Sequence, residues 1–252
     1  MKTIAILGCG NIGRIVAGQA ENVRIVGVFD QDRDRCHAVA ALCGATACES
    51  FDALMTLDFD LLVEAASVEA AEEYAPRVIE AGRDLVMLSV GALADDGLRA
   101  RLENLARVSG AKLRIPSGAV IGLDNLKVGR ISRLDRLLLK TTKPPAALGV
   151  EVDESTCLFR GPATESIKQF PRNINVAVSL SLAADRECEV EIWADPQATG
   201  NRHQVIFEGE FGRAEITVDN VPSPDNPRTS YLAALSVLAL IDDENHHIRV
   251  GT

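Results

Sequence analysis

The chain of 252 residues contains no long hydrophobic run, and this absence excludes one class of protein at the outset. No window approaches the roughly 20 apolar residues that a membrane-spanning helix requires. The apolar residues at the amino terminus stop at Gly8, too early for the hydrophobic core of a secretory signal peptide. Positive charge is also scarce, because 26 Lys and Arg stand against 36 Asp and Glu and the formal net charge is −10. We therefore expect neither nucleic acid nor a membrane surface as the main partner.

Paired cysteine spacings are missing as well. The six cysteines show no CxxC and no Cys/His spacing of the kind that binds metals, so we expect no metal site. They are typical of reduced, mostly buried thiols in a cytoplasmic protein. The sequence also lacks a GxSxG elbow, an HExxH pair, a P-loop lysine and an EF-hand loop, which leaves a serine or cysteine nucleophile without support.

What the sequence does contain is a glycine motif close to its start, Gly8-Cys9-Gly10-Asn11-Ile12-Gly13. The apolar run 3–7 before it predicts a buried parallel strand, and residues 14–22 after it predict a helix. A strand, a glycine turn and a helix in this order form the context in which GxGxxG binds a dinucleotide. There, the first glycine makes the turn, the second lets the backbone approach a pyrophosphate, and the third allows helix and strand to pack closely.

A second expected strand, 24–29, ends in Asp30, about 20 residues past the motif. An acid at this position accepts a hydrogen bond from the ribose 2′-hydroxyl of the cofactor. It favours NAD, because a carboxylate repels the additional phosphate of NADP. Arg33 lies close enough in the sequence to soften this preference, so we also expect some use of NADP.

Strands then alternate with helices of about 10 to 15 residues, which predicts an α/β domain of the Rossmann type with a doubly wound parallel sheet. The expected strands are 3–7, 24–29, 48–50, 60–66, 84–89 and 112–116. In such sheets the ligand lies at the carboxyl ends of the strands. We therefore expect the three strand ends at 64–67, 89–91 and 117–119 to lie near the nicotinamide, with Ala66 and Ser67 in contact with the cofactor.

Beyond residue 119 the pattern changes to strand-like pieces at 134–142, 188–194, 204–211 and 214–219. In several of them apolar and polar residues alternate, which predicts a largely antiparallel sheet with one solvated face. A helical stretch at 163–183, interrupted at Pro171, should pack on this sheet. We expect three parts in all: a dinucleotide-binding domain at 1–118, an α+β substrate domain at 119–222, and a C-terminal helix at 223–252 that packs back on the first domain. A proline-rich hinge at 222–227 should precede that helix.

His203 is the first candidate for chemistry. It lies in the turn-rich polar stretch 194–204, which we interpret as a loop between two strands. An imidazole suits proton exchange with an amino or hydroxyl group near neutral pH. A surface histidine in a mobile loop is an equal alternative on these residues alone. Asp195 could orient the imidazole or cap the turn before Pro196.

The second candidate is a polar cluster between residues 168 and 177. Lys168 and Arg172 are four residues apart, so on a continuing helix they would share a face and could hold substrate carboxylates. Asn173 and Asn175 offer amide donors and acceptors to the substrate or to the nicotinamide carboxamide. Solvated cations and helix-capping asparagines are the plainer alternative.

These motifs together resemble the L-aspartate dehydrogenase family over nearly the whole chain. Besides the glycine motif, the resemblance is carried by Pro116-Ser117-Gly118-Ala119, Phe170-Pro171-Arg172-Asn173-Ile174-Asn175-Val176-Ala177, Ala194-Asp195-Pro196 with Asn201-Arg202-His203, and Asn226-Pro227-Arg228-Thr229-Ser230-Tyr231. It implies that His203 is the general acid/base. It also implies that Ala119 and one of Asn173 and Asn175 contact the cofactor, and of these two asparagines we favour Asn175.

The resemblance further implies a reaction, in which C2 of L-aspartate gives a hydride to NAD or NADP. The iminoaspartate that results is hydrolysed to oxaloacetate and ammonia or feeds NAD biosynthesis. His203 would move the proton or activate water at the imine carbon, while the protein supplies orientation. A homodimer joined through the second-domain sheets is expected on the same ground. The assignment of Lys168, Arg172 and Asn173 to substrate binding is our own hypothesis, which the resemblance does not supply.

Two other functions compete with this one. A related Rossmann enzyme could act on another small acid, as homoserine dehydrogenase or dihydrodipicolinate reductase does. The latter requires a His-His-x-x-Lys run, and no lysine follows His246-His247. A non-catalytic NAD(H)-binding redox sensor would require a DNA-binding or partner-binding module, of which the acidic sequence shows no sign.

Overall fold

The structure is a computed structural model that describes residues 1–170, 174–224, 226–243, 246–248 and 250–251. The chain divides into two compact units: unit 1 comprises Met1–Pro116 and Ala234–Arg249, and unit 2 comprises Ser117–Ala233 and Val250–Thr252. None of the helices within the described ranges has the length and apolar character that crossing a membrane requires. The boundary between Ala233 and Ala234 falls inside the C-terminal helix at Tyr231–Asp243.

Unit 1 is built on a six-stranded sheet in the order β3-β2-β1-β4-β5-β6, in which every neighbouring pair is parallel. Its strands are β1 (Lys2–Leu7), β2 (Val23–Phe29), β3 (Thr46–Ala47), β4 (Leu61–Glu64), β5 (Asp84–Met87) and β6 (Leu113–Arg114). All four residues of β4 are buried, as expected for a strand covered on both faces. This is the parallel sheet that the sequence predicts.

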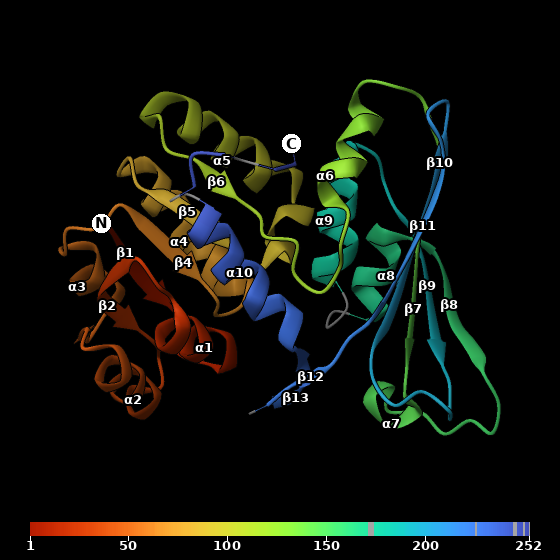
Figure 1. Cartoon of the computed structure of the whole chain (residues 1–252), viewed down its shortest axis with the longest axis horizontal. Coiled ribbons are helices and arrows are strands. Elements are labelled where there is room, and N and C mark those ends of the chain that lie inside the picture. The colour runs from red at the N-terminus through yellow and green to blue at the C-terminus, as the bar shows by residue number, and fades with distance from the viewer. Residues whose placement is uncertain (171–173, 225, 244–245, 249, 252) are drawn as a thin grey trace. The chain divides into compact units, whose positions relative to one another are not determined.

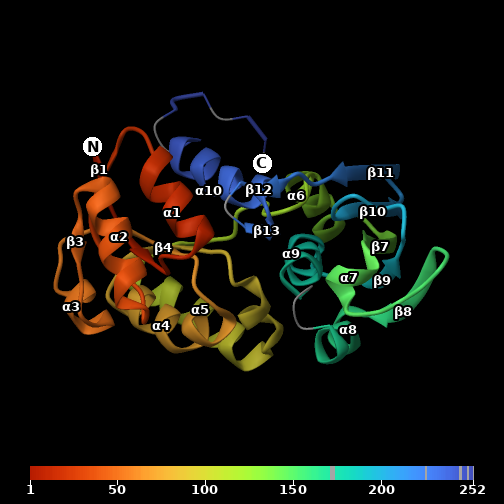
Figure 2. The same cartoon turned by 90° about the horizontal axis from the view of Figure 1, so that it is seen from below.

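Helices cover both faces of this sheet. They are α1 (Asn11–Gln19), α2 (Arg33–Cys43), α3 (Phe51–Met55), α4 (Val68–Glu80), the 3-10 helix η1 (Val90–Ala94), α5 (Asp96–Ser109) and α10 (Tyr231–Asp243). Helices α1 and α10 lie on one face, and α4 and α5 lie on the other (Figure 2). Val237 and Ile241 of α10 share a buried core with Val16 of α1 and Val63 of β4, and both views show α10 beside α1 (Figures 1 and 2).

Unit 2 contains a five-stranded sheet in the order β11-β10-β7-β9-β8. Its strands are β7 (Leu134–Lys143), β8 (Thr156–Pro162), β9 (Glu189–Ala194), β10 (Arg202–Gly209) and β11 (Gly212–Asp219). Strands β7 and β9 are parallel, and the other three pairs are antiparallel, so the sheet is largely antiparallel as predicted. The helices of this unit are α6 (Leu123–Leu126), η2 (Lys127–Arg130), α7 (Pro145–Leu148), α8 (Ala163–Gln169) and α9 (Ile174–Ala184).

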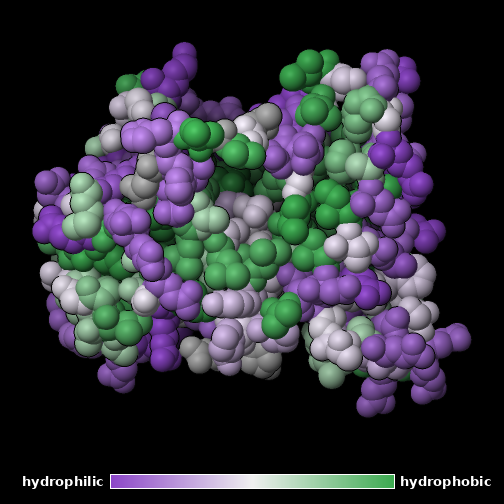
Figure 3. Space-filling view, viewed as in Figure 1, coloured by the Kyte–Doolittle hydropathy of each residue, from purple (hydrophilic) through white to green (hydrophobic). Residues whose placement is uncertain are grey.

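The core of unit 2 lies between one face of this sheet and helices α6 and α9. Leu137 and Leu139 of β7 alternate toward that face, as Val205 and Phe207 of β10 do, and they pack with Leu180 of α9. At the edge of the sheet, β11 has an exposed, charged surface, and hydrophilic side chains line the side of the molecule where β11 lies (Figure 3). Charges on an edge strand discourage pairing with another chain.

The structure corrects several local predictions. Strand β3 lies at Thr46–Ala47 rather than 48–50, and at two residues it is too short to show any period. Strand β8, absent from the prediction, pairs with β9. The expected hinge at 222–227 is wrong, because β12 (Pro222–Ser223) and β13 (Asn226–Ser230) pair with each other. A proline is tolerated as the first residue of a strand, which is where Pro222 stands.

Candidate active site

The turn between β1 and α1 is shaped by three glycines with different surroundings. Gly8 has a φ of +97°, and a Cβ there would lie 2.6 Å from the carbonyl of Ala65. A Cβ on Gly13 would lie 1.9 Å from the carbonyl oxygen of Gly8. A Cβ on Gly10 would have no described atom within 4 Å. Packing therefore requires glycine at positions 8 and 13, while Gly10 borders open space at the start of a helix, as a pyrophosphate site requires.

Helix α1 begins directly after this turn, and its residues Asn11 and Ile12 are half-buried. Gly10 is the N-cap residue and has no side chain that could accept from the N–H groups of the first turn. The helix dipole adds partial positive charge at the same place. The residues of the turn therefore fit the phosphates of a dinucleotide.

Asp30 lies at the end of β2 and binds the glycine turn directly. Its Oδ2 accepts from the N–H of Cys9 at 2.7 Å, and its Oδ1 accepts from the N–H of Asp32 at 2.8 Å. A carboxylate has about four acceptor positions, so these bonds leave capacity for a ribose hydroxyl. Nearby, the guanidinium of Arg33 lies 3.0 Å from the carboxylate of Glu49, and both side chains are largely exposed.

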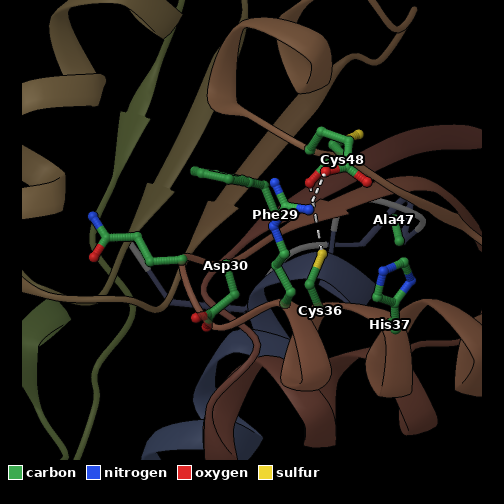
Figure 4. Close-up of a pocket in the computed structure, with 9 residues that line it drawn as sticks. Phe29, Asp30, Cys36, His37, Ala47 and Cys48 are labelled. Carbon is green, nitrogen blue, oxygen red and sulfur yellow. Dashed lines mark hydrogen bonds and ion pairs between the residues drawn. The ribbon is translucent and has the colours of Figure 1, made fainter.

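A pocket of about 260 Å³ lies beside Asp30, between the end of β2, helix α2 and the residues that follow β3. Cys36, His37, Ala47 and Cys48 line it, and in Figure 4 the carboxylate of Asp30 points away from these four side chains. Asp30 belongs to the lining of this pocket, although its carboxylate is turned away from the Cys36 and His37 side chains (Figure 4). No cluster of three or more His, Cys, Asp or Glu side chains that could hold a metal occurs in the described part of the chain.

Glu64, in the strand end 64–67 that we predict near the nicotinamide, ties two strand ends together. Its side chain is only 1% exposed at the carboxyl end of β4. Oε1 accepts from the N–H of Ala66 at 2.8 Å and from the hydroxyl of Ser89 at 2.7 Å, and Oε2 accepts from the N–H of Ser89 at 2.9 Å. Burial raises the pKa of this carboxyl above its usual value, which the bonds from Ser89 and Ala66 oppose. Glu64 thus fixes the turns that follow β4 and β5.

Ala66 and Ser67, which we predict near the nicotinamide, lie exposed in the turn that Glu64 holds. Ser67 is the N-cap of α4, and its Oγ accepts from the N–H of Ala70 at 3.2 Å. The same hydroxyl donates to the carboxylate of Glu69. The backbone N–H of Glu69 and, to a smaller extent, this bond lower the pKa of that carboxyl.

Ala119, in unit 2, follows Gly118 in a turn beyond β6. The side-chain amide of Asn220 donates to the carbonyl oxygen of Ala119 at 3.1 Å, and the hydroxyl of Ser230 donates to the amide oxygen of Asn220. Asn220 and Ser230 are each 8% exposed. The backbone at Ala119 is therefore held by a buried polar chain that the sequence analysis did not find.

His203 lies on strand β10, so the predicted loop around it is wrong. Gly200 and Asn201 suggested a turn, but His203, Val205 and Phe207 alternate toward the covered face of the sheet. His203 is 6% exposed and stands opposite Thr141 of β7 in the antiparallel register. Its Nδ1 lies 3.0 Å from Oγ1 of Thr141. Asp195 instead caps its own turn, since its Oδ1 accepts from the N–H of Gln197 at 2.8 Å.

Lys143, the last residue of β7, is the charged neighbour of this imidazole. Burial, and secondarily the charge of Lys143, lower the pKa of His203 from 6.5 to about 4. Burial also lowers the pKa of the Lys143 ammonium. The imidazole of His203 is therefore neutral near pH 7, so it can accept a proton. Residues 139, 141 and 143 of β7 alternate toward one face. This period could have predicted from the sequence that Thr141 and Lys143 share a face with the core, but not that they lie beside His203.

The predicted cluster at 168–177 is only partly described. Lys168 belongs to α8, and Asn175 is an exposed residue in the first turn of α9. Arg172 and Asn173 lie outside the described residues. The structure therefore does not test whether these four side chains meet.

Comparison with known proteins relates the chain to one family. Residues 124–244 match the family model described as aspartate dehydrogenase, C-terminal, and residues 8–116 match that described as homoserine dehydrogenase, NAD binding domain. An L-aspartate dehydrogenase from Methanospirillum hungatei is 51% identical over 252 residues, which cover 100% of both chains. One from Methanothermobacter thermautotrophicus is 42% identical over 256 residues, covering 100% of this chain and 99% of the relative. The chain belongs to the L-aspartate dehydrogenase family.

Solved structures agree with this membership. The crystal structure of an aspartate dehydrogenase from Thermotoga maritima has a TM-score of 0.84 and 29% identity, with 100% of each chain covered. An amine dehydrogenase from Mycobacterium smegmatis, at 17% identity and a TM-score of 0.59 over 96% of this chain and 91% of its own, shares the fold alone. The chain has the dinucleotide-binding domain of an NAD(P)-dependent oxidoreductase, and the competing functions are not favoured.

Proposed function

We propose that the chain oxidises L-aspartate with NAD, and to a lesser extent with NADP. L-Aspartate loses a hydride from C2 and a proton from its amino group, so that the C–N bond becomes the C=N bond of iminoaspartate. Water then converts iminoaspartate to oxaloacetate and ammonia. The observation that carries this proposal is the buried, neutral imidazole of His203 in a chain that is 51% identical to an L-aspartate dehydrogenase over its whole length.

Unit 1 is the proposed cofactor domain. Gly8, Gly10 and Gly13, with Asn11 and Ile12 at the start of α1, would hold the pyrophosphate. Asp30 would accept from the ribose, which favours NAD. Ala66, Ser67, Ala119 and Asn175 are the remaining residues that we propose for the cofactor. The close approach of Gly8 to Ala66 supports the first two, and the family resemblance is the ground for Ala119 and Asn175. When bound, NAD supplies the hydride acceptor.

His203 is the proposed general base. The amino group of aspartate is an ammonium ion at neutral pH, and its nitrogen must lose a proton before C2 can release a hydride. A neutral imidazole accepts that proton, and the same group can later activate water at the imine carbon. The geometry supports this role, because the buried ring is held at Nδ1 by Thr141, and the lowered pKa means only that the ring is neutral at pH 7.

Lys168, Arg172 and Asn173 remain our proposed substrate-binding residues. L-Aspartate carries two carboxylates, and in a chain with a net charge of −10 a dianion has to be bound by a few well-placed cations. Arginine suits one of these positions, since its guanidinium can hold a carboxylate through two parallel hydrogen bonds.

The direct test is to mix the purified protein with NAD and L-aspartate at mildly alkaline pH and to follow the absorbance of the reduced nicotinamide. We expect a signal with aspartate that is absent with homoserine and malate and nearly lost in His203→Ala. Turnover that survives the substitution would remove the role of His203 but keep the reaction. Binding of NAD without turnover of any of the three compounds would refute the proposed substrate.

The cytoplasmic location and the homodimer through the unit 2 sheet complete the proposal. The location rests on the pattern of reduced cysteines, and the homodimer rests on the resemblance. Light scattering coupled to size-exclusion chromatography measures the mass of the protein in solution and so tests the homodimer. A mass of about 27 kDa, that of one chain, would exclude the dimer.

A further inference from the structure

A group of three polar side chains, Thr141, Lys143 and His203, extends the covered face of the unit 2 sheet beyond its apolar core. Along β7 the core residues Leu137 and Leu139 are followed on the same face by Thr141 and Lys143, because side chains two apart in a strand point the same way. His203 stands directly opposite Thr141, so Lys143 is its diagonal neighbour, within reach of a long side chain. The backbone of Lys143 is held too, since its carbonyl accepts from the N–H of Asp195 at 3.0 Å.

We propose that Lys143 binds a carboxylate of the substrate beside the imidazole, and that Thr141 holds the ring so that Nε2 of His203 exchanges the proton. This inference rests on the function proposed above and assigns two further residues to that reaction. Lys143 would then bind one carboxylate of L-aspartate, and Lys168 or Arg172 could bind the other.

The surroundings of Lys143 favour an anionic ligand. The ammonium is half-buried, and a charge withdrawn from water is stabilised when an opposite charge binds it. An ammonium has three N–H donors, each of which can donate to a carboxylate oxygen. A carboxylate bound there places the rest of a short amino acid next to His203.

Thr141 suits a ring that gains and loses a proton at Nε2. Nδ1–H can donate to Oγ1 of Thr141 both in the neutral ring and in the imidazolium, so the bond persists through the exchange. A carboxylate in place of the hydroxyl would stabilise the imidazolium and raise the pKa of the ring. The hydroxyl leaves the ring neutral, which the nearby charge of Lys143 reinforces.

The first test is kinetic, with Lys140→Met as the matched control for Lys143→Met. Lys140 lies on the same strand but on the opposite face, with its ammonium 4.4 Å from the centre of the Trp193 ring. We expect Lys143→Met to raise the KM for aspartate about 10- to 100-fold while the KM for NAD stays unchanged. Lys143→Arg should recover part of the loss. Equal effects on both KM values, or equal effects of the two lysine substitutions, would overturn the role of Lys143.

Thr141 is tested by Thr141→Val, which keeps the shape but removes the hydroxyl, and by Thr141→Ser, which restores it. We expect Thr141→Val to lower kcat about tenfold and to shift the pH profile of kcat, with both effects reversed in Thr141→Ser. A loss of activity that Thr141→Ser does not recover, or a lower unfolding temperature with an unchanged pH profile, would show that Thr141 only packs.

The second test does not depend on turnover. The His203 ring is titrated by NMR, with its signals assigned by their loss in His203→Gln, in the presence and absence of succinate as a dicarboxylate probe. Val218 of β11 and Thr141 of β7 flank the ring and are uncharged, so Lys143 is the charged group of the described chain that acts on it. We expect Lys143→Met to raise the pKa of His203 by about one unit and to abolish the effect of succinate.

These outcomes separate the two proposals. If the wild-type protein does not oxidise aspartate but succinate shifts the His203 signals only when Lys143 is present, the substrate is wrong and the dicarboxylate site is right. If aspartate is oxidised but Lys143→Met changes neither the KM for aspartate nor the titration of His203, the inference is wrong and the function stands.

Discussion

His203 is a buried base whose environment has consequences for stability as well as for chemistry. Its pKa is lowered from 6.5 to about 4, so between these values the unfolded chain binds a proton that the folded chain does not. The stabilising contribution is therefore complete above about pH 6.5 and is lost as the pH falls toward 4. A catalytic base held neutral by burial in this way makes the fold sensitive to acid.

We predict that the free energy of unfolding falls between pH 7 and pH 5 by about 2 kcal/mol more in the wild-type protein than in His203→Gln. The other titrating groups are common to both proteins and cancel in the comparison. Urea unfolding at the two pH values measures the difference. The same pH dependence in both proteins would mean that the folded state does not depress the pKa of His203.

Asp30 is the residue at which cofactor choice should be decided. Asp30→Ala removes the negative charge at the ribose position, so we predict that the ratio of kcat/KM for NADP to that for NAD rises about tenfold. Because Asp30 also accepts from the N–H of Cys9, the same change should weaken both cofactors. Asp30→Asn keeps an acceptor for that N–H but loses the charge, and it should shift the ratio with less loss of affinity. An unchanged ratio in both variants would place Asp30 away from the ribose.

At the scale of single elements, the carboxyl end of β4 is held by the buried carboxylate of Glu64. Glu64 accepts three hydrogen bonds that join the turns after β4 and β5. At the other end of the strand, Asp60 accepts from the N–H and the hydroxyl of Thr3, at 2.7 and 2.8 Å. Both carboxylates accept hydrogen bonds from a backbone N–H and a hydroxyl group, but only Glu64 holds the turns where we propose that the cofactor binds.

We predict that Glu64→Gln weakens NAD binding about tenfold and lowers the free energy of unfolding by about 2 kcal/mol, since the amide group would set a donor against the N–H groups of Ala66 and Ser89. Asp60→Asn is the matched control: it should lower stability and leave the Kd for NAD unchanged. Calorimetric titration with NAD and thermal unfolding measure the two quantities. Equal effects of both variants on the Kd would contradict a local role for Glu64.

The glycine turn gives a second prediction for one element. Gly10→Ala should leave the unfolding temperature nearly unchanged, because the added methyl group meets no described atom within 4 Å, but it should strongly weaken NAD binding. Gly13→Ala should destabilise unit 1, because its methyl group would overlap the carbonyl of Gly8. Calorimetry of both variants tests this contrast, and unimpaired binding of NAD by Gly10→Ala would contradict it.

Sequence periodicity predicted the elements of unit 1 better than the placement of single residues. The glycine motif and the runs before Asp30 and Ser67 led to β1, β2 and β4, because buried parallel strands are continuous apolar runs. The strand end 64–67 was predicted near the nicotinamide, but the bracing role of Glu64 was not, because the sequence does not show the three donors that its carboxylate accepts from. In unit 2, Gly200 and Asn201 concealed the start of β10, and only the register brings Thr141 to His203.

At the scale of the whole molecule, the chain assigns its tasks to two units with different sheets. Unit 1 contains the glycine turn and Asp30, while unit 2 contains His203, Thr141 and Lys143. Net negative charge over the chain as a whole makes a local cation such as Lys143 more important for binding a dicarboxylate.

The most direct test of the account follows the hydrogen at C2 of the substrate. The protein is incubated with NAD and L-aspartate deuterated at C2, and the reduced nicotinamide is analysed by NMR. The account predicts that the deuterium is recovered at C4 of the nicotinamide, with a slower rate than for unlabelled aspartate if hydride release limits turnover. Reduced nicotinamide that carries no deuterium, or no reduction at all, would contradict it.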